Sequence, residues 1–241
     1  MLPIVINDAE PLERYGHNVT RLAQQGAFPP LAGQDAVAAR VFHVLQRKRK
    51  CNPVILASDE SKRWAVVAEV IRLMAVGEVP DAFPKRQVIA LDYEALFNDT
   101  SRRQERREQL LAFWFEQLTQ LGHESDEEWP VRVGNIPFWP RLEEWIAPTM
   151  VLERLQAIFM AMQQANGSVV LFVDHFHRLL GGERERYPIN AFSLLKPTLR
   201  LPRIRLIGAC TLEQYQRSIE RELSIHGMCQ EICLPAVSLA D

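Results

Sequence analysis

Residues 53–74 read "PVILASDESKRWAVVAEVIRLM", and this stretch decides the fold. It opens with a short apolar run that predicts a buried strand, and it closes with apolar residues at helical spacing. Between the two lie residues 57–64, "ASDESKRW". A strand, a tight eight-residue loop and a helix form the layout of a phosphate-binding loop, although this loop holds no glycine.

Three further strands are predicted along the chain. They are "RQVIALD" (86–92), "SVVLFVD" (168–174) and "IRLIGACT" (204–211). Short β-branched runs separated by helices predict an α/β fold, a doubly wound parallel sheet with helices on both faces. Ligands of such sheets bind beyond the carboxyl ends of the strands. Residues 57–64, Asp174 and Thr211 all follow predicted strands, so we expect them at that edge.

Two helices are predicted before the first strand. Residues 12–28 carry apolar residues at helical spacing and stop at Gly26, which predicts one N-terminal helix. A second helix begins near Asp35, which is expected to cap it, and closes on the four cations at 47–50. Near the end of the chain, Cys229 and Cys233 are spaced to share one face of a helix.

Composition indicates an ordinary soluble protein. The chain has 241 residues, 47% of them hydrophobic and 24% charged, with a net charge of -2, and we expect a single domain spanning 1–241. A nucleic-acid partner is therefore not expected, unless a local patch such as 47–50 or 102–107 binds one. We also expect a cytoplasmic location without membrane contact, because no apolar run approaches the roughly 20 residues that span a bilayer. Four scattered cysteines predict a reducing compartment and no metal site.

Residues 97–152 differ in character from the rest. They hold an arginine-rich stretch, an aromatic stretch and an acidic stretch, and their apolar residues recur at helical spacing. We expect a largely helical insertion. It packs on its own domain or binds a partner protein through the aromatic anchors Trp114, Phe138, Trp139 and Trp145.

The order of these pieces resembles a known family. "LERYGHNVTRLAQQGAFPPLAGQDAVAARVFHVLQRKRKCNPVIL" (12–56), "VVLFVDHFHRLLGG" (169–182) and "RLIGACTLEQY" (205–215) are similar to the first ATPase module of Clp-type AAA+ unfoldases and disaggregases. The resemblance covers residues 12 to about 222 apart from 97–152, which replaces the region of the family's pore loop. It implies the αβα sandwich of P-loop NTPases, and it implies ATP and Mg²⁺ as the family's cofactors.

The resemblance assigns roles that the residues at 57–64 do not match. In the family, glycines let backbone amides surround the phosphates, a lysine bridges the β- and γ-phosphates, and a hydroxyl holds Mg²⁺. The eight positions here are Ala57, Ser58, Asp59, Glu60, Ser61, Lys62, Arg63 and Trp64. Ala57, Glu60 and Lys62 stand at the glycine positions, Arg63 at the lysine position and Trp64 at the hydroxyl position. Side chains at the glycine positions would fill the space for phosphate.

The later motifs are mixed. Asp174 stands where the family's aspartate assists Mg²⁺, but His175 replaces the glutamate that polarises water, and Thr211 stands at the position of a polar sensor. A metal site at Asp174, His175 and His177 is an alternative, but neighbouring histidines at a strand end are more often hydrogen-bonded or exposed. Gly227 and Met228 stand at the positions of the family's ring arginines, with Arg217 and Arg221 nearby if the alignment slips.

These departures predict a catalytically inactive, AAA+-like module without a nucleotide cofactor. It would act as a structural or protein-interaction subunit, alone in self-association or docked on active Clp-type subunits. The alternative is an atypical ATPase or chaperone component with ATP and Mg²⁺ that uses Arg63 and His175. A third interpretation is a nucleic-acid binder. The family's helical lid is not found after this domain, so either the protein lacks it or the sequence is part of a longer chain.

Overall fold

One sheet of six strands, in the order β1-β3-β4-β5-β2-β6, organises the residues that the computed structural model describes, which are 10–30, 33–80, 83–99, 139–180 and 190–234. The strands are β1 (Gly16–Asn18), β2 (Asn52–Leu56), β3 (Gln87–Leu91), β4 (Val169–Val173), β5 (Leu206–Cys210) and β6 (Cys229–Cys233). Strands β2 to β6 pair in parallel, and β1 pairs antiparallel with β3. The predicted doubly wound α/β sheet is confirmed, with one antiparallel edge strand that the sequence did not reveal.

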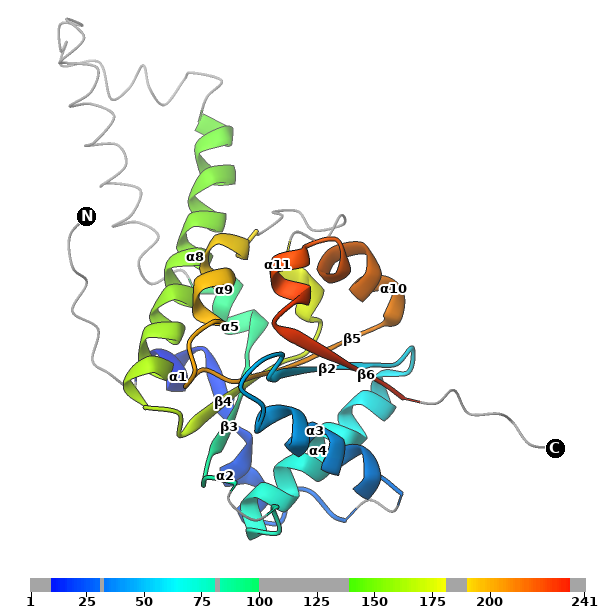
Figure 1. Cartoon of the computed structure of the whole chain (residues 1–241). Coiled ribbons are helices and arrows are strands. Elements are labelled where there is room, and N and C mark those ends of the chain that lie inside the picture. Colours follow the sequence, from blue (N-terminus) through cyan, green and yellow to red (C-terminus); the bar gives the residue numbers. More distant parts are fainter. Residues whose placement is uncertain (1–9, 31–32, 81–82, 100–138, 181–189, 235–241) are drawn as a thin grey trace, which may run out of the picture.

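The helices cover both faces of this sheet (Figure 1). The longer ones are α3 (Asp35–Leu45), α4 (Glu60–Val76) and α8 (Trp139–Gln164), and the shorter ones are α1 (Glu10–Arg14), α2 (Val19–Gln24), α5 (Tyr93–Asn98), α9 (Phe192–Thr198), α10 (Leu212–Tyr215) and α11 (Leu223–His226). A 3₁₀ turn, η1 (Phe176–Leu179), and a π-helical turn, η2 (Gln216–Glu220), complete the set. Helices α2, α3 and α4 pack on one face, and α8 and α9 pack on the other.

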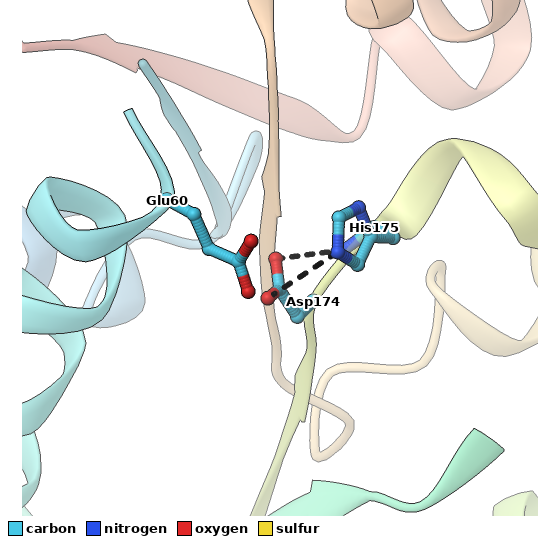
Figure 2. Close-up of side chains that lie close together, drawn as sticks. All are labelled: Glu60, Asp174 and His175. Atoms are coloured by element: carbon cyan, nitrogen blue, oxygen red, sulfur yellow. Dashed lines mark hydrogen bonds and ion pairs between the residues drawn. The ribbon is translucent and has the colours of Figure 1, made fainter. Parts of the chain in front are cut away.

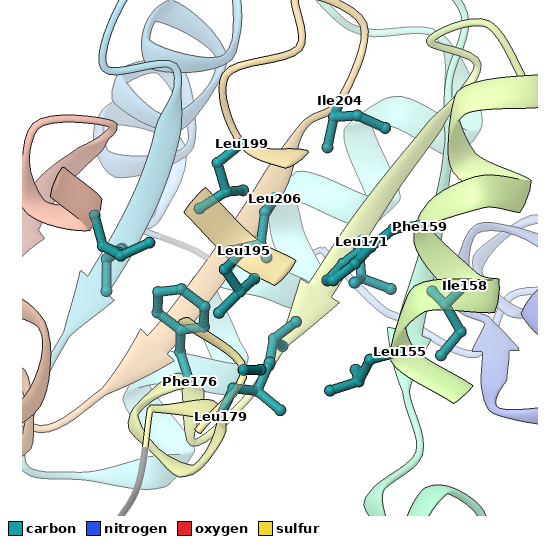
Figure 3. Close-up of a cluster of buried hydrophobic side chains, with 14 of the residues drawn as sticks. Leu155, Ile158, Phe159, Leu171, Phe176, Leu179, Leu195, Leu199, Ile204 and Leu206 are labelled. Carbon is teal, nitrogen blue, oxygen red and sulfur yellow. The ribbon is translucent and has the colours of Figure 1, made fainter. Parts of the chain in front are cut away.

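The strands β2, β4 and β5 are buried along their whole length because helices cover both faces. On the α8 face, Leu155 and Ile158 of α8 pack against Leu171 of β4 and Leu195 of α9 (Figure 3). Each is 1% exposed or less, which stabilises the fold by roughly 1.5–3 kcal/mol per side chain. This core fixes the carboxyl ends of β4 and β5, where the candidate site lies.

The predicted helix at 12–28 is wrong, because the segment divides into α1, β1 and α2. Gly16 is the reason. A Cβ built on Gly16 would lie 2.5 Å from Cγ2 of Ile89 and 3.0 Å from the carbonyl oxygen of Leu12. Only glycine allows the chain to approach β3 this closely and to add an edge strand.

Two other local predictions are corrected. Asp35 is the first residue of α3 rather than its cap, the N-cap is Gln34 without a side-chain hydrogen bond, and the helix ends at Leu45 before the cations at 47–50. Cys229 and Cys233 share a strand, β6, and not a helix, because the segment adds a parallel edge to β2.

The segment 97–152 lies largely outside the described residues. Its first residues fall in α5, and its last part belongs to α8, which runs from Trp139 without interruption into the core helix that ends at Gln164. Of residues 139–149 only the backbone is described. Among the described helices, none combines the length and the apolar character that crossing a membrane requires.

The four cysteines should differ sharply in reactivity. Cys51, Cys210 and Cys229 are buried and Cys233 is exposed, and burial raises the pKa of the Cys210 and Cys229 thiols to about 12. We expect an aromatic disulfide reagent at mildly alkaline pH to modify one thiol rapidly in the native protein and all four in denaturant, because only the thiolate reacts. Rapid reaction of two or more thiols in the native state would contradict this packing.

Candidate functional site

The junction between β2 and α4 is shorter than the sequence predicted. Only residues 57–59 connect the strand to the helix, since α4 begins at Glu60, so the expected eight-residue loop is wrong in length. Asp59 is the N-cap of α4, and its carboxylate accepts the backbone N–H of Ser61 at 2.9 Å. Without glycines to hold an open loop, capping by Asp59 lets the helix take in residues 60–64.

Three backbone amides of this junction already have partners within the fold. The N–H of Ala57 donates to the carbonyl of Cys210 at 3.3 Å, and the N–H of Arg63 donates to the carbonyl of Asp59 at 3.3 Å. The N–H of Ser61 is held by the cap described above. A phosphate bound here would have to displace hydrogen bonds that the fold makes.

Arg63 occupies the interior of the junction. Its side chain is 3% exposed, its Nη1 donates to the carbonyl of Ala57 at 2.8 Å, and its Nε lies 3.8 Å from Oδ1 of Asp174. Nε is buried and has no hydrogen-bond partner. The guanidinium therefore links the end of β2 to the end of β4, and its charge is directed into the protein and away from solvent.

Two carboxylates and an imidazole gather above this arginine. One ligand atom each from Glu60, Asp174 and His175 lies within 4.8 Å of the others, and Figure 2 shows Glu60 pointing from the first turn of α4 toward Asp174. Asp174 accepts the backbone N–H of His175 at 2.8 Å, and Nε2 of His175 lies 3.8 Å from Oδ2 of Asp174. Two carboxylates face one guanidinium, so the site is acidic. These donors are of the kind that divalent metals accept.

The alternative metal site suggested by the sequence consisted of Asp174, His175 and His177. In the structure, the potential metal ligands that lie together are Glu60, Asp174 and His175. His177 is near, with its ring centroid 6.0 Å from that of His175, but the third ligating atom close to Asp174 comes from Glu60. From the sequence, Glu60 was expected only to occupy the space that a phosphate would need. Its approach to Asp174 depends on the early start of α4.

Trp64 points away from this group. Its ring packs edge to face on Phe172, with centroids 5.1 Å apart, within the core between the sheet and helices α3 and α4. The buried Cys210 is the last residue of β5, next to the site. The pKa of this thiol is raised to about 12, chiefly by burial and in small part by the Asp174 carboxylate, while the Arg63 cation opposes the rise. Cys210 is therefore a neutral lining group rather than a nucleophile.

The curated proteins and the solved structures that resemble this chain are chaperones. No family model matches the chain. It is 28% identical over 95% of its length to chaperone protein ClpB 1 of Thermosynechococcus vestitus, 26% identical over 96% to ClpB of Gloeobacter violaceus, and 26% identical over 96% to chloroplastic ClpB2 of Oryza sativa. The chain spans about a fifth of the length of these relatives, since it covers 21%, 21% and 19% of them.

Solved structures of yeast Hsp104 share the fold. An extended Hsp104 complex with casein superposes with a TM-score of 0.64 at 20% identity, and a closed Hsp104 complex with ATPγS and labelled casein gives 0.65 at 20% identity. Both matches cover 95% of this chain and 31% of the Hsp104 chain. The chain has the fold of a Clp-type AAA+ module. The resemblance seen in the sequence is confirmed.

In this AAA+ fold, Thr211 lies beside the site, because β5 runs between β2 and β4. Its hydroxyl accepts the N–H of Gln214 at 3.2 Å, and the Gln214 side chain accepts the N–H of Thr211 at 3.0 Å. This reciprocal capping box begins α10. Thr211 thus has a structural use that the strand pattern alone did not indicate.

The other predicted positions are dispersed. Gly227 follows α11, and Met228 immediately precedes β6. Arg217 is paired with Glu213 at 2.6 Å on the surface. Trp114 and Phe138 lie outside the described residues, and Trp139 and Trp145 belong to α8 at positions where only the backbone is described. The aromatic partner site stays a prediction.

The link between Arg63 and Asp174 can be measured by a double-mutant cycle. We expect Arg63→Met and Asp174→Asn each to lower the free energy of unfolding by about 2–3 kcal/mol, because each leaves a partly buried charge without its partner. The double variant should cost about 1–2 kcal/mol less than the sum. Denaturant unfolding at pH 7 gives all four values.

A matched control is available on the surface. Arg217 and Glu213 form an ion pair at 2.6 Å, with side chains 62% and 71% exposed. The cycle of Arg217→Met and Glu213→Gln should give a coupling below about 0.5 kcal/mol, because solvent screens the pair. Additive effects of the Arg63 and Asp174 substitutions would show that the buried contact does not bind the two strands together.

Proposed function

We propose that this chain is a Clp-like chaperone module that does not hydrolyse ATP and acts by binding other proteins. Homology to ClpB supports the chaperone part. The β2–α4 junction supports the inactive part, since the amides of Ala57, Ser61 and Arg63 are hydrogen-bonded within the fold and the Arg63 side chain fills the interior of the junction. In this proposal, residues 57–64 are a degenerate phosphate-binding loop whose lysine has become a buried structural arginine.

Electrostatics supports the same conclusion. The carboxylates of Glu60 and Asp174 lie at the mouth of the site, and Arg63 is the buried cation described beside them. A phosphate oxygen about 4 Å from an unpaired carboxylate is repelled by about 4 kcal/mol per charge pair at an effective dielectric of ~20. That repulsion lowers affinity by about a thousandfold. Phosphate is disfavoured even before its hydrogen bonds are counted.

Trp64 and His175 give separate support for the proposed loss of ATP hydrolysis. An indole packed on Phe172 supplies no oxygen to Mg²⁺, and no hydroxyl replaces it at that position. His175 has a left-handed backbone conformation, with φ of 47°, which directs it toward Asp174. As a base, its ring would have to act on a water held by a nucleotide that the junction does not favour.

A protein-binding role has its own support. Leu223 is 80% exposed and Leu212 is 48% exposed, and both belong to the short helices that follow β5. Exposed leucines of this kind are available to contact another protein. The Hsp104 relatives were solved in complexes with casein. Another copy of this chain, or active Clp-type subunits, are the partners that this proposal favours.

One observation favours the alternative of an ATP-binding module with a variant loop. A closed Hsp104 structure carries ATPγS, and Lys62 and Arg63 put two cations in the first turns of α4. This alternative requires Arg63 to leave its buried position and face the nucleotide. It predicts a thermal shift with ATP that Arg63→Met abolishes.

The deciding experiment restores the loop. In a variant with Ala57→Gly, Glu60→Gly, Lys62→Gly, Arg63→Lys and Trp64→Thr, we expect MgATP to raise the melting temperature and to bind at least about tenfold more tightly than to the wild type. The wild type should show a flat response at millimolar MgATP and no phosphate release.

The control variant carries the same four other substitutions with Arg63→Met. It lacks the cation that meets the phosphates, so it should bind no better than the wild type. Steady Mg²⁺-dependent turnover by the wild type, lost on Arg63→Met, would refute the proposal and establish the variant ATPase. If neither loop variant binds, the obstruction lies outside residues 57–64.

A further inference from the structure

The amino ends of the parallel strands carry a second charged surface, opposite the candidate site. Nine cations come from the loops that precede β2, β3 and β5, and eight of them lie within five residues of the strand that follows. We call these eight the basic edge: Arg47, Lys48, Arg49, Lys50, Lys85, Arg86, Arg203 and Arg205. Hydrogen bonds tie these loops together, since Arg205 donates from Nε to the carbonyl of Leu45 at 3.0 Å and from Nη2 to that of Arg47 at 3.3 Å.

Within the described residues, no carboxylate pairs with the basic edge. The partners that its arginines do have are neutral. Arg47 donates to the side chain of Gln230 at 2.8 Å, and Arg203 donates to the side chain of Asn166. Lys48, Arg49, Lys50 and Lys85 are exposed to solvent. The surface is thus strongly positive in a protein whose net charge is -2.

Arg205 is explained by the fold. It is 7% exposed, and its guanidinium donates to the carbonyls that end α3 and to those of Pro202 and Ile204. Carbonyls at a helix C-terminus carry partial negative charge, so they offset part of its cost of burial. Arg205 therefore serves as a cap for α3 and closes the loop before β5.

Arg86 is not explained in this way. Side chains alternate along a strand, so Arg86 lies on the same face of the sheet as Val88, and Arg205 lies on the same face as Ile207. Val88 and Ile207 both belong to the core under α3 and α4. The two arginines are therefore on the face that these helices cover. The guanidinium of Arg86 stacks over Phe83 at 5.3 Å, and its Nε and Nη1 are buried without a hydrogen-bond partner. Burial lowers the pKa of Arg86, and the nearby Arg205 cation lowers it further.

A partly buried cation whose Nε and Nη1 have no hydrogen-bond partner, and which lies near a second cation, is costly, and an anion would reduce that cost. We propose that the basic edge binds an acidic polypeptide segment of a partner protein, with one carboxylate reaching Arg86 and further carboxylates meeting Lys48, Lys50 and Lys85. Planar guanidinium and carboxylate groups are matched in shape and charge.

A polypeptide suits the surface better than nucleic acid. A long phosphate backbone would extend past the basic edge over a chain of net charge -2, where the field becomes repulsive. A short acidic segment contacts only the local patch. The cations also come from three loops around one partly buried arginine, which favours a discrete group held at one point.

This inference deepens the protein-binding part of the proposed function and rests on it, but it does not depend on the loss of ATPase activity. Binding is measured without nucleotide. A positive ATP result would therefore refute the inactive module and leave the basic edge untouched. If the basic edge does not bind an acidic peptide, the conclusion about ATP binding is equally unaffected.

The test uses a short fluorescein-labelled polyglutamate peptide and the full chain in fluorescence anisotropy. We expect saturable binding at low salt that weakens toward physiological ionic strength, where the Debye length is about 8 Å. The variant Lys48→Gln/Lys50→Gln/Lys85→Gln should bind about tenfold more weakly, since three exposed ion pairs are lost. These side chains have no hydrogen bonds to lose, so folding should persist.

The matched control, Arg14→Gln/Arg217→Gln/Arg221→Gln, removes three exposed cations that lie outside the basic edge. It should keep the wild-type affinity. An equal loss in both triple variants, or no saturable binding, would overturn the proposal. So would a labelled DNA oligonucleotide of equal charge that binds more tightly than the peptide through the same three lysines, because the surface would then be a nucleic-acid site.

Substitutions of Arg86 distinguish a ligand-binding role of this arginine from a structural role. Arg86→Met keeps the packing on Phe83 and removes the charge. We expect it to weaken peptide binding at least about threefold and to raise the melting temperature of the free protein by about 2–4 °C, since an unpaired charge leaves the interior. Arg86→Lys should retain most of the affinity. Unchanged peptide affinity in Arg86→Met, or a lowered melting temperature, would show that the fold needs this cation for itself.

Discussion

The guanidinium of Arg63 is the contact on which the carboxyl end of the sheet depends. It is almost fully buried, it holds the carbonyl of Ala57, and it lies against the carboxylate of Asp174. A charge this far from water needs a partner of opposite sign, because otherwise nothing offsets the free-energy cost of removing it from water. The junction between β2 and α4 is therefore closed from inside. The Asp59 cap keeps the connection short and starts α4 early, and this early start brings Glu60 to the mouth of the closed junction.

The sheet was predictable because buried parallel strands are apolar on both faces. Runs such as Val169–Val173 stand out from a sequence in which helices alternate with turns. The two edge strands were not predictable for the opposite reason. Three residues, "GHN", have no pattern to detect in β1, and β6 alternates buried and exposed positions imperfectly. The break at Gly16 depends on its contact with Ile89, which lies far away in the sequence.

The site was predictable in location but not in detail. Parallel strands bring their carboxyl ends to one edge, and this places residues 57–59, Asp174 and Thr211 together. What each side chain does there depends on contacts between distant segments. Arg63, which only the alternative interpretation assigned to a nucleotide, lies against Asp174, and Thr211 caps a helix that a strand pattern does not indicate. A family comparison shows which residue has changed, whereas only the packing shows what the new residue does.

The two ends of the sheet also differ in how their charges are satisfied. At the carboxyl end, the Arg63 cation and the Asp174 carboxylate lie against each other, and Asp174 also accepts a backbone N–H. At the amino end, the cations have neutral partners or none, as the buried Nε and Nη1 of Arg86 illustrate. Charges that a fold neutralises internally contribute little to an encounter, whereas unpaired ones create a field that orients an approaching partner. The surface available for electrostatic recognition therefore lies on the side away from the site that gives the family its chemistry.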